Sequence, residues 1–61
     1  MAQITTKELG AISDALAVEQ TLVGKYNYYS SIATDDTLKT KYEQLANRHQ
    51  HHFDELYSHI K

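Results

Sequence analysis

Three residues of this chain have side chains that can bind a metal ion or exchange a proton: Glu19, His49 and His52. His49 and His52 are three residues apart, so on an α-helix their side chains are neighbours. His49 also falls among apolar residues on one helical face, where burial is expected. A buried polar group without a partner costs about 1–3 kcal/mol. Because Glu19 is the only acid in the matching apolar stripe of the first half of the chain, we expect it to meet both histidines.

The spacing of apolar residues predicts the elements that position these side chains. Two stripes recur in steps of three and four residues, which is the spacing of one face of a helix. We expect helices at about residues 6–33 and 37–60, joined by a turn at about 34–36. One unbroken helix is the alternative. The stripes are Leu9, Ile12, Leu16, Glu19, Val23, Tyr26 and Ser30, and then Leu38, Tyr42, Leu45, His49, His52, Phe53, Leu56 and Ile60.

Both helix starts carry capping signals. Thr5 followed by Glu8 is the pattern of a capping box, in which each side chain accepts a hydrogen bond from the backbone of the other residue. At the second helix, Thr34 or Asp36 is the expected N-cap, because short polar side chains favour that position. The turn makes the two helices antiparallel neighbours, and opposite positions then have residue numbers that sum to about 70. This arithmetic places Glu19 level with the segment from His49 to His52.

Composition limits the class of protein. The chain has 61 residues, which predicts one domain over residues 1–61. It has no cysteine, so a disulfide or a thiolate metal site is excluded. The formal charge of −2 argues against binding to nucleic acid or to an anionic membrane surface. The first residues form no apolar run, so we expect no signal peptide and a cytoplasmic location.

The width of the apolar stripes predicts self-association. One antiparallel neighbour covers only one line of contact, and both stripes are wider than that. An exposed apolar strip of this size is typical of an association site. The simplest solution is a homodimer in which two hairpins form a four-helix bundle. The alternative is a module whose apolar strip binds helices of another protein.

Two interpretations of the Glu19, His49 and His52 group stay open. In the first, these residues form a hydrogen-bonded layer that fixes the register and the oligomeric state of a bundle. In the second, they bind a transition metal, since imidazole and carboxylate ligands suit zinc, iron, manganese or copper. The sequence contains neither a nucleophile with a histidine–acid pair nor a glycine-rich phosphate loop, so we expect no enzyme.

Several short motifs resemble a known family. The pattern Leu16-x-x-Glu19-x-x-Leu22 is similar to the first helix of a ferritin-like half-bundle, and Ala46-x-x-His49-x-x-His52 is similar to the second. Over nearly its full length, the chain resembles the very short spore coat proteins of clostridia-like bacteria, related to the coat F type. The motifs that carry this resemblance are Thr5-Thr6-Lys7-Glu8-Leu9, the mid-helix acid Glu19, Thr34-Asp35-Asp36-Thr37-Leu38-Lys39 and His49-Gln50-His51-His52-Phe53.

The resemblance implies a ferritin-like helical hairpin that dimerises and acts as a small structural protein. It implies sporulation as the setting, the spore coat as the place of deposition, and other coat proteins as partners. In the ferritin-like superfamily, Glu19 and His52 would occupy positions of metal ligands. His49 departs from the pattern, because the superfamily has glutamate there. The loss of that bridging carboxylate argues against di-iron oxidase activity.

Overall fold

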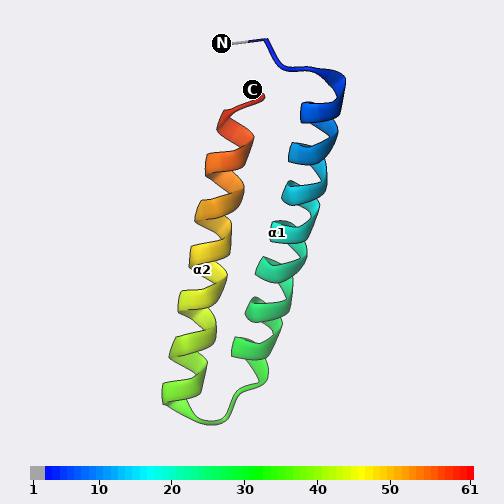
Figure 1. The fold of residues 1–61 in the computed structure, drawn as a ribbon. Coiled ribbons are helices and arrows are strands. Elements are labelled where there is room, and N and C mark those ends of the chain that lie inside the picture. Colours follow the sequence, from blue (N-terminus) through cyan, green and yellow to red (C-terminus); the bar gives the residue numbers. More distant parts are fainter. Residues whose placement is uncertain (1–2) are drawn as a thin grey trace.

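The computed structural model describes residues 3–61 as two helices that pack side by side as an antiparallel hairpin (Figure 1). Helix α1 spans Thr6–Ile32 and helix α2 spans Asp36–Ser58. The predicted all-helical hairpin is therefore confirmed, and the alternative of one unbroken helix is wrong. The hairpin is slender, with extents of 47 × 16 × 11 Å. Within residues 3–61, neither helix has an apolar stretch sufficient to span a bilayer.

The capping box predicted at the start of α1 is present. The Glu8 backbone N–H donates to Thr5 Oγ1 at 3.0 Å, and the Thr5 backbone N–H donates to Glu8 Oε1 at 3.1 Å. The hydrogen bonds from the Thr5 backbone and side chain lower the pKa of the Glu8 carboxyl from its usual value. The carboxylate also lies in the first turn, where the helix dipole favours negative charge.

The turn differs from the prediction in one respect. Asp35 is the N-cap of α2, and its Oδ1 accepts a hydrogen bond from the Leu38 backbone N–H at 2.7 Å. The prediction of Thr34 or Asp36 as the cap is wrong, because α2 begins at Asp36, one residue earlier than expected. The residue directly before that start supplies the cap. At the other side of the turn, the Ala33 N–H donates to the Tyr29 carbonyl at 3.0 Å and ends α1.

The interior of the hairpin is thin. Among residues 3–61, only Ala46 and Ser30 are buried, and most of the larger residues of both stripes are half-buried. Leu9 and Leu38, which the stripes place on the buried face, are 41% and 44% exposed. The reason is that each lies near the end of its helix, where the neighbouring helix covers less of it. A single pair of helices therefore leaves most apolar side chains in contact with water.

Of the six large hydrophobic side chains that are exposed within residues 3–61, three lie on one side of the hairpin: Val18, Ile32 and Leu38. On α1, Val18 and Ile32 are 58% and 57% exposed. Beside them lies a half-buried row with seven-residue spacing, which consists of Ala15, Leu22 and Tyr29. A shallow depression joins Tyr29 and Ile32 of α1 to Leu38 of α2, so these rows share one side of the molecule. We call this side the open face. Its residues are Ala15, Val18, Leu22, Tyr29 and Ile32 of α1 and the seven-residue row Leu38, Leu45 and His52 of α2.

The cap geometry predicts the effect of two neighbouring substitutions. Asp35→Ala removes the acceptor for the Leu38 N–H and should lower the free energy of unfolding by about 1 kcal/mol. Asp36→Ala is the matched control, because it removes an acid of the same type that does not cap the helix, and its effect should be smaller. Urea denaturation followed by circular dichroism measures both. Equal losses in the two variants would contradict the assignment of the cap.

Candidate functional site

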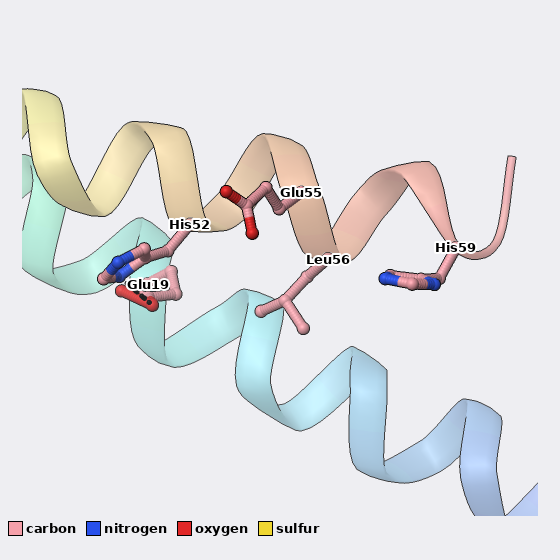
Figure 2. A pocket seen from close by; sticks show the side chains of 5 residues that line it. All are labelled: Glu19, His52, Glu55, Leu56 and His59. Carbon is pink, nitrogen blue, oxygen red and sulfur yellow. Dashed lines mark ion pairs between the residues drawn. The ribbon is translucent and has the colours of Figure 1, made fainter.

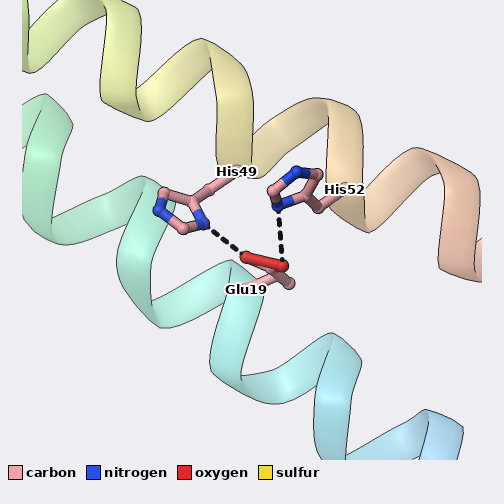
Figure 3. A group of neighbouring side chains, drawn as sticks. All are labelled: Glu19, His49 and His52. Atoms are coloured by element: carbon pink, nitrogen blue, oxygen red, sulfur yellow. Dashed lines mark hydrogen bonds and ion pairs between the residues drawn. The ribbon is translucent and has the colours of Figure 1, made fainter.

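Figure 3 shows the carboxylate of Glu19, which lies at the middle of α1, facing two imidazole rings of α2. His49 Nδ1 is 2.5 Å from Glu19 Oε1, and His52 Nδ1 is 3.2 Å from Glu19 Oε2. Each carboxylate oxygen therefore has its own histidine partner. The contact joins residues that are thirty positions or more apart in the sequence. The predicted meeting of Glu19 with both histidines is confirmed, and we refer to these three residues as the polar cluster.

The two histidines contact Glu19 in different ways. An ionised carboxylate only accepts hydrogen bonds, so His49 Nδ1 carries the proton in its hydrogen bond to Glu19 Oε1, whereas His52 Nδ1 lies at ion-pair distance from Oε2. The side chains differ in exposure: Glu19 is 15% exposed, His49 is 20% exposed and His52 is 45% exposed. His52 therefore forms the outer edge of the cluster, on the open face. Its higher exposure differs from the burial that its place on the apolar stripe suggests.

A stack of aromatic rings supports the inner part of the cluster. The Tyr26 ring lies 5.7 Å from the His49 ring, centroid to centroid, at an interplanar angle of 13°. Tyr42 in turn stacks on Tyr26 at 6.2 Å and 22°. Within the described residues neither tyrosine hydroxyl has a side-chain hydrogen bond, so these tyrosines contact the cluster through their rings alone.

A shallow pocket adjoins the outer edge of the cluster. Figure 2 shows the side chains that line it: Glu19, His52, Glu55, Leu56 and His59. Leu56 separates His59 from the carboxylate of Glu19. Glu55 pairs with His51 at 2.8 Å on the surface, where both side chains are more than 60% exposed. Exposed pairs of this kind contribute little to stability. Because His51 and Glu55 pair with each other on the surface and not with Glu19, we do not count them in the polar cluster.

The polar cluster has the donor set of a metal site. One ligand atom from each of Glu19, His49 and His52 can be chosen so that all three lie within 4.8 Å of one another. Nitrogen and oxygen donors of this kind suit zinc, iron and manganese. No family model matches this chain, and neither a curated protein nor a solved structure matches it. The resemblance to spore coat and ferritin-like proteins therefore stays a prediction.

The cluster should be tightly coupled to stability. Glu19→Ala leaves the half-buried His49 without its acceptor and should lower the free energy of unfolding by about 1–3 kcal/mol. Glu43→Ala removes an exposed acid of α2 and should have little effect. The double variant Glu19→Leu/His49→Leu, which removes both partners, should recover most of the loss. Urea denaturation at one protein concentration measures the three values. A Glu19→Ala variant as stable as the control would contradict the coupling.

Proposed function

We propose that this protein is a structural protein that assembles with itself, and that two hairpins join through their open faces into a four-helix bundle. The resemblance to short spore coat proteins supports a role as a coat component that contacts other coat proteins after deposition. The observation that carries the proposal is the amount of surface that a single hairpin leaves exposed. No large apolar side chain within residues 3–61 is fully buried.

The exposed area supports a second copy as the occupant of the open face. The hairpin has a mass of 7.0 kDa and an accessible surface of 4735 Å². A folded monomer of that mass exposes about 4,000 Å², so the hairpin exposes about 700 Å² more than expected. A stable protein interface buries about 800 Å² on each partner. The excess is therefore of the size that one symmetric contact removes.

Symmetry also supports the pairing of like faces. A two-fold dimer buries the same patch on both copies, so the patch has to be compatible with itself. The open face meets this condition, because Val18, Leu22 and Ile32 are apolar and the row on α2 adds Leu38 and Leu45. The bundle would give each stripe the second neighbour that the hairpin lacks. Its core would then hold two polar clusters.

A charge on the open face should separate the copies. Val18→Lys places an ammonium group on an apolar contact, while its 58% exposure means that the hairpin itself is not disturbed. At micromolar concentrations we expect the wild type to be a dimer and Val18→Lys to be a monomer in sedimentation equilibrium. Gln20→Lys is the matched control, since Gln20 is exposed and points away from the open face. This control should remain a dimer.

A wild-type protein that is monomeric at millimolar concentration and melts cooperatively would overturn the proposed assembly. A poorly folded wild-type monomer would instead favour the alternative, in which helices of another protein complete the core. Circular dichroism on the same samples distinguishes these two results.

The second candidate function is binding of a transition metal, and the polar cluster is the observation that favours it. Glu19 comes from α1, and His49 and His52 come from α2. The three side chains face one another between the two helices. A bundle core is a common place for such sites, because facing helices project carboxylate and imidazole groups into it. A bound zinc, iron or manganese ion would supply a strong positive charge that holds the two helices in register.

Metal content tests this second function directly. Tag-free wild-type protein from medium supplemented with zinc, iron and manganese should carry a stoichiometric amount of one metal. Glu19→Ala should lose that metal, whereas Glu43→Ala, an exposed acid outside the cluster, should retain it. Elemental analysis of the three purified proteins measures this. A wild type with less than a tenth of an equivalent of every metal would exclude the metal function.

A further inference from the structure

We propose that one divalent cation, with the chemistry of Zn²⁺, is shared by two copies of the chain, each of which supplies Glu19 Oε2 and His52 Nδ1. His49 does not bind the ion and instead holds the carboxylate of Glu19 in place. The inference rests on the proposed dimer and on the proposed metal function. It goes beyond them by assigning the ligands, the stoichiometry and the dependence of metal binding on assembly.

The two distances within the cluster separate a ligand pair from a hydrogen-bonded pair. Zinc binds histidine nitrogen and carboxylate oxygen at about 2.0–2.2 Å, so two tetrahedral ligands lie about 3.3 Å apart. His52 Nδ1 and Glu19 Oε2 are 3.2 Å apart, so both can bind one ion with almost no movement. The ion would bind the lone pair of His52 Nδ1, and the neutral His52 ring would carry its proton on Nε2.

His49 fits a different role. Its Nδ1 is hydrogen-bonded to Glu19 Oε1, and the two atoms are closer together than two ligands of one ion can lie. The Tyr26 ring stacked on His49 fixes the plane of the imidazole. His49 therefore holds one carboxylate oxygen, which leaves Oε2 directed toward His52. Partners of this kind orient a ligand and typically change metal affinity by 10- to 100-fold.

Two ligands from one chain are too few for a closed zinc site, which needs four. The place of the cluster in the hairpin supplies the other two. Glu19 is the central residue of α1, with thirteen residues on either side of it in Thr6–Ile32. In a two-fold pair of fully overlapping hairpins, the two clusters therefore lie level with each other, whichever way the partner runs. His52 is the most exposed member and belongs to the open face, so it meets the second copy.

Binding of the ion and dimerisation are then linked. A ligand that binds only the dimer lowers the dissociation constant of the dimer. The factor is one plus the ratio of the free ligand concentration to the dissociation constant of the ligand. At a free Zn²⁺ concentration one hundred times that constant, the dissociation constant of the dimer should fall by about a hundredfold. The converse also holds: a monomeric variant should bind Zn²⁺ only weakly.

Native mass spectrometry of tag-free protein, with Zn²⁺ added after a chelator, tests the stoichiometry. We expect one Zn²⁺ in each dimer and none in the Val18→Lys monomer, with the Gln20→Lys control equal to the wild type. One Zn²⁺ per chain, or equal affinity in Val18→Lys, would overturn the sharing, because the chain would then complete the site by itself. Glu55, at the edge of the neighbouring pocket, would be the residue to test in that case.

The same substitution at the two histidines tests the assigned roles. His52→Leu should abolish both Zn²⁺ uptake and the Zn²⁺-dependent strengthening of the dimer. His49→Leu should retain one Zn²⁺ per dimer with an affinity reduced by about 10- to 100-fold. With Co²⁺ in place of Zn²⁺, the intense visible absorption of a tetrahedral ion should persist in His49→Leu and vanish in His52→Leu. The reverse pattern, or equal losses, would overturn the assignment.

Failure of this inference can be told apart from failure of the functions on which it rests. A wild type that is monomeric both with and without Zn²⁺ overturns the proposed assembly and the shared site together. A dimer that forms in chelator and takes up no Zn²⁺ overturns the shared site and leaves the assembly intact.

Discussion

Two helices in contact cover each other along a single line, and most features of this molecule follow from that constraint. The N-terminal ends of both helices are well capped, because the side chains of Thr5 and Asp35 accept hydrogen bonds from backbone N–H groups that have no partner within the helix. The interior of the hairpin is nevertheless thin, with one alanine and one serine as the only buried residues among those described. Small domains bury little surface by themselves, and a second layer of helices or a bound ion is the usual source of additional stability.

The energetic cost of the polar cluster depends on how much water the thin interior leaves around it. An acid that is buried without partners is costly, since the desolvation of a charged group can exceed what the interactions inside the protein return. Here Glu19 is 15% exposed and each of its oxygens has a nitrogen partner. A second copy on the open face would remove the remaining water. The cluster would then either hold the register of the bundle through polar contacts or bind a metal ion.

The sequence predicts the architecture well because the information is local. The three- and four-residue spacing, the Thr5–Glu8 pair and the short polar turn each act within a few residues, and the helix limits agree to within two residues. The meeting of Glu19 with His49 and His52 also follows, because residues at equal distances from the turn of an antiparallel hairpin lie opposite each other. The cap at Asp35 was missed because three adjacent residues can all serve as caps, and the choice depends on a one-residue shift of the helix start.

What the sequence could not provide is the difference between the two histidines. Both lie on the same apolar stripe, so periodicity assigns them equal burial. The structure separates them, because His49 points along the line of helix contact and stacks on Tyr26, whereas His52 lies at its edge with 45% of its side chain exposed. That difference follows from the limited width of one helix contact. The same geometric limit that leaves the apolar rows uncovered therefore also leaves the His52 imidazole accessible to a partner.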